Sequence, residues 1–191
     1  MTTVEIHEKL SGKFGDKIGP LSEGVDPSCV VATDAIAEVC RWLAETPELS
    51  LKSLMCLSAT DDKEKLGVVY NLHSIAHNHR ITLKIELPDR ENAHAPTVSG
   101  VFGTADWHER EAYDMMGIVF DGHPDLRRIL CPEDWEGYPL RKDYQVQEFY
   151  RGLKVPYSEG QNPDRGHWIS RDIPDQRPTP PQRREPDLTG I

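Results

Sequence analysis

Five side chains of types that commonly bind metal ions lie close together in the sequence: His108, Glu109, Glu111, His123 and Asp125. A zinc hydrolase of the H-E-x-x-H type needs a second histidine four positions after the first, so that both imidazoles share one helix face. Ala112 occupies that position. The later histidine and aspartate flank a proline, where a turn with side-chain to backbone hydrogen bonds accounts for both residue types. A metal-dependent hydrolase is therefore a distant alternative.

Other catalytic and cofactor-binding patterns are missing from the sequence. The four cysteines form no C-x-x-C pair, the usual core of zinc and iron–sulfur ligand sets: Cys29, Cys40, Cys56 and Cys131. Free thiols are expected rather than disulfides, because no secretory signal is present. There is no glycine-rich loop of the dinucleotide-binding or P-loop type. Three histidines around an expected hairpin are interpreted as exposed polar positions rather than metal ligands: His73, His77 and His79.

Charged and large apolar side chains are interleaved between residues 107 and 144. From Glu109 to Asp143 the chain carries nine acidic and five basic side chains. A run of charges usually marks only a solvated face, but tryptophan, tyrosine, methionine and phenylalanine residues separate these charges. Aromatic, methionine and arginine side chains are enriched in protein–protein interfaces. The segment is therefore interpreted as a surface that binds another protein.

The same segment resembles a known family. The stretch EREAYDMMGIVFDGHPDLRRIL (109–130), followed by PEDWEGYPLRKDY (132–144), is similar to the signature of the 30-kDa or C subunit of respiratory complex I. Complex I is the proton-pumping NADH:quinone oxidoreductase. Gln145 departs from the pattern, because many members of the family have proline there. Outside this segment the chain resembles the family only in length and element order.

The resemblance implies a non-catalytic subunit of the hydrophilic arm that holds no cofactor of its own. FMN, iron–sulfur clusters and quinone are expected in other subunits. Members of the family pack on the 49-kDa or D subunit near the quinone site, and they support assembly and electron transfer from NADH to quinone. The expected partners are therefore the 49-kDa/D subunit and other hydrophilic-arm subunits, at the cytoplasmic face of the bacterial inner membrane. The alternative is an equivalent subunit of a related membrane-bound hydrogenase or dehydrogenase complex.

No catalytic, cofactor-binding or metal-binding residue is predicted. The residues expected at the partner interface are charged, aromatic or histidine: Glu109, Arg110, Glu111, Tyr113, Asp114, His123, Asp125, Arg127, Arg128, Trp135, Arg141, Lys142, Asp143, Tyr144 and Trp168. Guanidinium groups can bind a partner's carboxylates with two parallel hydrogen bonds. Arg110 and Asp114 lie four positions apart on an expected helix and are spaced to pair with each other.

The hydrophobic pattern predicts the elements that must position these residues. Helices are expected at residues 3–11, from Thr33 as N-cap to Pro47, and from Thr104 as N-cap to Met116, before Gly117. Strands are expected at 29–32, 51–59, 66–76, 81–87 and 118–120, with a turn at 77–79 and loops at 12–27 and 121–144. This order favours an α+β fold of two layers, with helices packed on a largely antiparallel sheet and an extended C-terminal tail.

The chain is predicted to have three regions. Residues 1–96 form the α+β core, 97–155 complete the domain and form the interface, and 156–191 are a proline-rich tail in which Trp168 favours a strap that wraps a partner. The net charge of −10 argues against binding nucleic acid or anionic lipid. No apolar run reaches the roughly 20 residues that span a bilayer, so direct membrane insertion is not expected.

Overall fold

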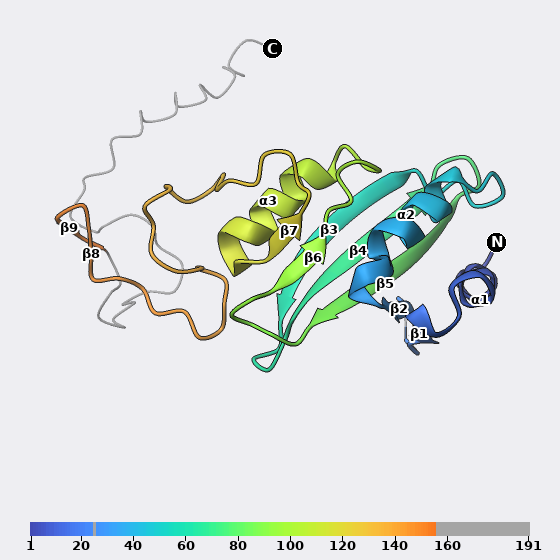
Figure 1. Ribbon diagram of the computed structural model, residues 1–191, viewed down its shortest axis with the longest axis horizontal. Coiled ribbons are helices and arrows are strands. Elements are labelled where there is room, and N and C mark those ends of the chain that lie inside the picture. Colours follow the sequence, from blue (N-terminus) through green and yellow to red (C-terminus); the bar gives the residue numbers. More distant parts are fainter. Residues whose placement is uncertain (25, 156–191) are drawn as a thin grey trace, which may run out of the picture.

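The computed structural model describes residues 1–24 and 26–155 (Figure 1). The predicted tail, with Trp168, lies outside the described residues. The chain begins with helix α1 (Thr3–Phe14), which starts at a capping box: the Thr2 side chain accepts the Glu5 N–H at 3.3 Å, and the Glu5 carboxylate accepts the Thr2 N–H at 3.1 Å. Helix residues Ile6 and Leu10, one turn apart, are fully buried in the core.

A five-stranded mixed sheet forms the centre of the fold, in the order β1-β2-β5-β4-β3. Its strands are β1 (Ile18–Leu21), β2 (Ser28–Val31), β3 (Ser53–Asp61), β4 (Leu66–Ser74) and β5 (His79–Leu87). β2 runs parallel to β5, and every other pair of neighbours is antiparallel. Val68, Tyr70 and Leu72 alternate along β4 and are fully buried, which confirms that one face of this sheet lies against the core.

Helix α2 (Ile36–Glu45) covers that face, and α3 (Ala105–Met116) lies beside β3 (Figure 1). α2 buries four apolar side chains at i, i+3, i+4 and i+7: Ile36, Val39, Cys40 and Leu43. Two short parallel strands, β6 (His94–Pro96) and β7 (Val119–Asp121), bring the chain on either side of α3 together. Helices packed on a largely antiparallel sheet confirm the predicted α+β class.

Several local predictions differ from the structure. α1 and a 3-10 turn (Gly15–Lys17) lead into β1, where a loop was expected, because Gly19 and Pro20 hide the strand pattern. Thr33 is not a helix cap: it opens a 3-10 turn (Thr33–Ala35), and its hydroxyl donates to the Glu86 carbonyl oxygen at 3.2 Å. The hairpin turn occupies residues 75–78, so His79 already belongs to β5. The short strands β6, β8 (Phe149–Tyr150) and β9 (Leu153–Lys154) were not predicted.

Candidate functional site

Three charged residues of α3 point into the protein. Glu109 and Asp114 are fully buried, and Arg110 is 6% exposed. Charged side chains are rarely buried unless partners compensate for the lost water. Helical spacing could have identified Glu109 as an inward position, because it shares one face with Ala105, Ala112 and Met116, which are all buried. The partners of these charges show how α3 holds the loop segment that follows β7, at residues 122–144.

The Asp114 carboxylate binds the main chain of the segment after β7. Its Oδ2 atom accepts the N–H groups of Ile129, Leu130 and Cys131 at 2.9, 2.6 and 2.9 Å. Its Oδ1 atom accepts from the Arg128 guanidinium at 3.0 Å. Burial raises the pKa of Asp114, but the four donors outweigh it and hold the pKa below its usual value. One buried carboxylate thus fixes the path of residues 128–131.

The predicted pairing of Arg110 with Asp114 is wrong, because Asp114 pairs with Arg128 instead. The Arg110 guanidinium lies 5.0 Å from the centre of the Trp107 ring, within the range of a cation–π contact. It also donates to the Arg127 carbonyl oxygen at 3.4 Å. Helical spacing permitted the pair, but three main-chain donors and a second arginine bind the carboxylate better.

Two guanidinium groups lie over the ring of Tyr138. The centres of Arg128 and Arg141 are 5.4 and 4.6 Å from the ring centroid, and Arg141 Nε donates to the Met116 carbonyl oxygen at 2.7 Å. Gly117 ends α3 in the left-handed region, with φ of 72°. A Cβ atom on Gly117 would come within 2.5 Å of the Tyr138 ring. Only glycine therefore allows the segment to pack this closely on the end of α3.

A second carboxylate fastens the far end of the segment. Asp61, at the end of β3, has a side chain that is 1% exposed and forms two hydrogen bonds with the Arg90 guanidinium. The same Asp61 accepts the Lys142 N–H at 2.9 Å, and Arg90 also binds the Asp143 carboxylate at 2.9 Å. The hydrogen bond with Arg90 is the main reason that the pKa of Asp61 lies well below its usual value. The segment is therefore tied to both α3 and the sheet.

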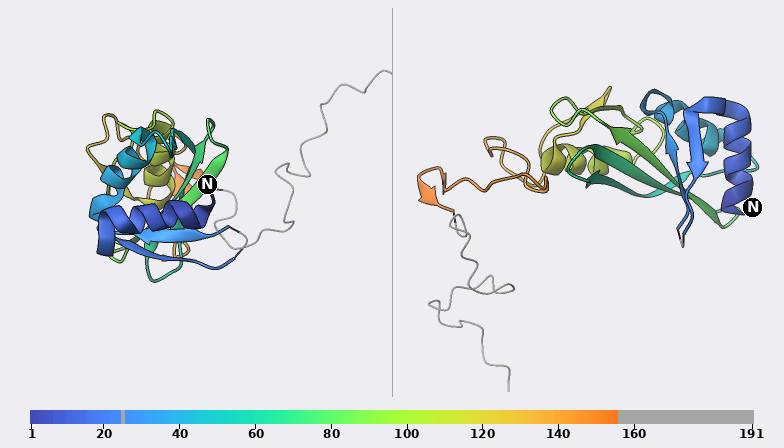
Figure 2. Two further views of the ribbon diagram at one scale, coloured as in Figure 1. Left: turned by 90° about the vertical axis from the view of Figure 1, so that its right-hand side faces the viewer. Right: turned by 90° about the horizontal axis from the view of Figure 1, so that it is seen from below.

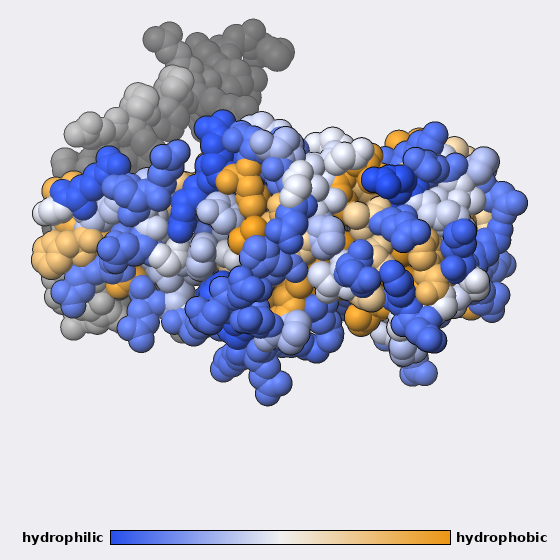
Figure 3. All heavy atoms as spheres, viewed as in Figure 1, coloured by the Kyte–Doolittle hydropathy of each residue, from blue (hydrophilic) through white to orange (hydrophobic). Residues whose placement is uncertain are grey.

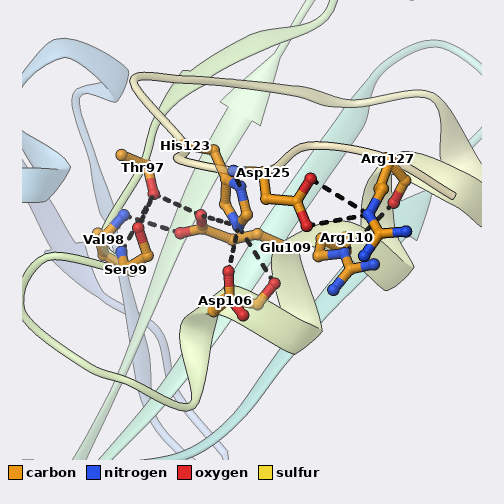
Figure 4. A network of polar contacts seen from close by, with 9 residues as sticks. All are labelled: Thr97, Val98, Ser99, Asp106, Glu109, Arg110, His123, Asp125 and Arg127. Carbon is orange, nitrogen blue, oxygen red and sulfur yellow. Dashed lines mark hydrogen bonds and ion pairs between the residues drawn. The ribbon is translucent and has the colours of Figure 1, made fainter. Parts of the chain in front are cut away.

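Glu109 forms the centre of a third group of contacts, beneath the turn at residues 122–125 (Figure 4). One carboxylate oxygen accepts the Val98 N–H at 2.7 Å, and the other accepts the Thr97 hydroxyl at 2.5 Å. Burial raises the pKa of Glu109, and the bonds from Thr97 and Val98 oppose that rise. The carboxylate thus holds the strand-to-helix connection before α3, at the same helix end that contacts the His123 turn.

The contacts of His123 assign its tautomer. Nδ1 lies 3.0 Å from the Asp125 main-chain nitrogen, which can only donate, so Nδ1 accepts and Nε2 carries the proton (Figure 4). Nε2 then donates toward Asp106, whose carbonyl oxygen and carboxylate are each 3.2 Å away. Glu109 lies further off, at 3.8 Å. The fully buried imidazole is therefore a structural link between α3 and the turn.

An arm formed by residues 145–155 projects from the body of the protein (Figure 2). Its two short strands, β8 and β9, pair as a hairpin. The Asp134 carboxylate binds the Arg151 guanidinium at 2.9 and 3.0 Å and the Tyr150 hydroxyl at 2.9 Å. The Trp135 ring packs on Tyr150 at 5.1 Å and donates to the Tyr144 hydroxyl at 3.0 Å. Asp134 and Trp135 thus connect the arm to the segment.

The structure separates the predicted interface residues that lie before residue 156 into three groups. Buried side chains with internal contacts are Glu109, Arg110, Asp114 and His123. Partly buried side chains are Tyr113, Arg128, Trp135, Arg141 and Tyr144. Exposed side chains are Glu111, Asp125, Arg127, Lys142 and Asp143. Contact of any of these residues with a partner stays a prediction, but the buried group already serves to hold the segment in place.

Several exposed apolar side chains lie on the surface of this region, and the predicted set omitted them. They are Trp107, Leu130, Leu140, Val146, Phe149 and Leu153, each between 44% and 75% exposed. Apolar side chains also gather on the β8–β9 hairpin, at one end of the molecule (Figure 3). Sequence alone could not separate exposed leucines from buried ones, because the segment has no helical or strand periodicity. Only the fixed main chain shows which side chains point outward.

The described residues contain no group of three or more histidine, cysteine, aspartate or glutamate side chains that could hold a metal ion. His79, predicted to be exposed, is buried, and its Nε2 atom contacts the Leu49 carbonyl oxygen at 2.8 Å. Burial raises the pKa of the Cys29 and Cys40 thiols to about 11 and about 12, so both stay protonated at neutral pH. Among the described helices, none has the length and apolar character needed to cross a membrane.

Comparisons with known proteins agree on one family. Residues 29–150 match the model of the respiratory-chain NADH dehydrogenase 30-kDa subunit. The C subunit of an NADH-quinone oxidoreductase from Chlorobium phaeobacteroides is 49% identical over 156 residues, which cover 79% of this chain and 93% of the relative. The C subunit from Chloroherpeton thalassium is 50% identical over 152 residues, covering 78% of this chain and 63% of that relative.

Two solved structures resemble the chain in fold. A trypsin-resistant fragment of Nqo5 superposes with a TM-score of 0.54 and 26% identity, covering 66% of this chain and all of the fragment. A chain of the membrane-bound sulfane sulfur reductase, an archaeal respiratory membrane complex, superposes with a TM-score of 0.60 and 26% identity. That match covers 74% of this chain and 84% of the other.

Proposed function

We propose a structural role for this chain, which belongs to the 30-kDa subunit family of the respiratory-chain NADH dehydrogenase. It serves as the C subunit of an NADH-quinone oxidoreductase, as its relatives are named. Its activity is therefore that of a multi-subunit oxidoreductase associated with a respiratory membrane, and the chain contributes by binding other subunits.

The observation that carries this proposal is the combination of a fixed main chain and outward apolar side chains. Asp114, Asp61 and Glu109 fix the segment from within. Leu130 and Leu140 are 62% and 57% exposed on that fixed segment. A preformed surface loses little conformational entropy on binding, so the burial of its apolar side chains is not offset by ordering. This arrangement suits a permanent interface between subunits.

The partner that fits best is the 49-kDa or D subunit, on which members of the family pack. We propose that residues 107–155 contact that subunit near the quinone site and support assembly and electron transfer from NADH to quinone in a proton-pumping complex. The chain is proposed to carry no FMN, iron–sulfur cluster or quinone of its own. It would lie peripherally, at the cytoplasmic face of the bacterial inner membrane, held there through the complex.

Charge substitution of the two exposed leucines tests the proposal. Burying the remaining surface of Leu130 and Leu140 would contribute about 1–2 kcal/mol each. The double variant Leu130→Glu and Leu140→Glu should therefore recover at least about tenfold less of the other subunits when the tagged chain is purified from native membranes. Thermal unfolding of the isolated variant should change little, because both side chains are exposed.

The matched control is Ile75→Glu, at the tip of the β4–β5 hairpin, where Ile75 is 81% exposed and lies outside the segment. It should co-purify with the same subunits as the unmodified chain. Equal recovery for the double variant and the control would contradict a docking role for this surface. A chain that co-purifies with no other subunit would contradict the function itself.

The structural match to the sulfane sulfur reductase chain favours one alternative, an equivalent subunit of a related membrane-bound hydrogenase or dehydrogenase complex. The same purification separates the two functions. Hydrogenases retain nickel-binding cysteines in the neighbouring large subunit, whereas quinone-reducing relatives lack them. Sequencing the co-purified large subunit would therefore decide between the alternatives.

A further inference from the structure

The five-stranded sheet has a second face, and none of the described helices covers it (Figure 2). The side chains that alternate with the buried residues of β4 and β5 point to this open face. Lys84 lies near its centre. It is in register with Val69 of β4 on one side and Val30 of β2 on the other, and Ser58 of β3 continues the row.

Apolar side chains lie among the polar ones on this open face. Val30 is 39% exposed and Met55 is 58% exposed. Asn71 and Thr82 are hydrogen-bonded to each other at 2.9 Å, so neither side chain is entirely free to bind water. A sheet face that stays in contact with water normally carries polar side chains throughout, as alternation places them there. Val30 and Met55 therefore interrupt the polar alternation of the open face with exposed apolar surface.

The charges on the open face differ from those of the chain as a whole. The chain carries 32 acidic residues, and two of their carboxylates lie near this face: Glu86, two positions after Lys84 on β5, and Asp26, which lines the same hollow as Lys84. Both are neutralised, Glu86 by Lys65 at 2.7 Å and Asp26 by Arg80 at 3.0 Å. Among the described ion pairs, none includes Lys84. Within residues 1–24 and 26–155, Lys84 thus places a positive charge at the centre of the open face without a paired carboxylate.

The dimensions suit an interface with another subunit. β3, β4 and β5 are nine residues long, or roughly 30 Å, and β2 is four residues long, so these four strands at a spacing of about 4.8 Å give about 500 Å² of surface. A stable contact buries about 800 Å² on each partner, so this face is large enough to supply more than half of one. A hollow of about 310 Å³ beside Lys84, lined among others by Met55 and Thr82, could receive a partner side chain.

We propose that the open face of the sheet binds a second protein subunit, one whose surface presents a carboxylate to Lys84 among aliphatic side chains. This inference rests on the proposed function, because it assumes that the chain is part of a complex. It adds a contact on the side of the sheet opposite α2, separate from the segment at residues 107–144. The chain would then bridge two neighbours.

Site-specific cross-linking within the assembled complex tests the proposal. A photo-crosslinking residue replaces Ser58, which is exposed in the same row as Lys84. A control replaces Lys52, which is exposed beside α2 on the other side of the molecule. Native membranes are irradiated, the tagged complex is purified, and the attached molecule is identified. Position 58 should attach to one subunit, and position 52 should not attach to that subunit.

Charge reversal then tests the role of Lys84. Lys84→Glu should lower the yield of that cross-link at least about tenfold, because like charges across an interface repel strongly. Lys52→Glu should leave it unchanged, and Lys84→Gln should give an intermediate yield while showing that the chain folds. Attachment to lipid alone, no attachment to protein, or an unchanged yield in Lys84→Glu would each overturn the proposal. A chain that enters no complex would refute the proposed function, and this inference with it.

Discussion

The substitution Asp114→Asn removes the charge that holds the segment after α3, at almost constant side-chain volume. Asp114 is fully buried and Arg128 is 13% exposed, so the change leaves a largely buried guanidinium without its carboxylate. The side-chain NH₂ group of asparagine is a donor, so it cannot accept the hydrogen bond that Arg128 or the main-chain N–H groups donate to it. Removing one partner of a buried ion pair costs about 3–5 kcal/mol. We expect that cost to appear as local detachment of the segment, because the buried apolar side chains of the described core end at Phe120, before the segment begins.

Amide hydrogen exchange measures that detachment directly. The N–H groups of residues 129–131 bind Asp114 in the unmodified protein. In the variant they should exchange roughly 10²- to 10⁴-fold faster, while amides of β4 and β5 keep their rates. The control Asp125→Asn removes an exposed partner of Arg127 and should leave both sets unchanged. Unaltered exchange at 129–131, or equal acceleration throughout the sheet, would refute the reasoning.

Two further predictions concern the same attachment. Gly117→Ala places a Cβ atom 2.5 Å from the Tyr138 ring at φ of 72°, whereas the control Gly103→Ala meets nothing within 4 Å. Only the first should lower the melting temperature, by about 2–4 °C for each kcal/mol of strain, and equal melting temperatures would contradict the packing. Acid should also release the segment, because folding lowers the pKa values of Asp61 and Asp114. The stability that these two carboxylates contribute is present above about pH 4 and is lost as the pH falls through their pKa values in the folded protein. Protection of residues 129–131, corrected for intrinsic exchange, should be constant from about pH 7 to pH 5 and fall below about pH 4, and full protection near pH 2 would contradict it.

Periodic elements could be predicted from the sequence because their patterns are local. The spacing of Ile36, Val39 and Leu43 indicated the buried face of α2, and Val68, Tyr70 and Leu72 indicated that of β4. β1 could not be predicted, since Gly19 and Pro20 interrupt the alternation. Its place in the sheet depends on pairing with β2, and no pattern within the residues of β1 indicates that pairing.

The segment at residues 107–144 was identified by composition and by resemblance, but composition did not show which charges point inward. Asp114 and Arg128 looked equally suited to an interface, yet they bind each other. Their pairing depends on the path of a loop that has no period. The path of the same loop also decides that the leucines at 130 and 140 are exposed. Only the three-dimensional structure therefore separates the residues that hold the loop in place from those that form its outer surface.

The recognition of main-chain N–H groups by Asp114 has a consequence for how this protein can evolve. Every amino acid except proline supplies the same N–H group, so residues 129–131 can change their side chains without losing the carboxylate that seats them. The side chains on the outer surface of this loop can therefore change together with those of a neighbouring subunit, while the main chain of the loop keeps its position. Asp114 has no such freedom, since a longer or neutral side chain would move the acceptor or weaken it. A lineage could thus adapt its contacts to a new neighbour one side chain at a time.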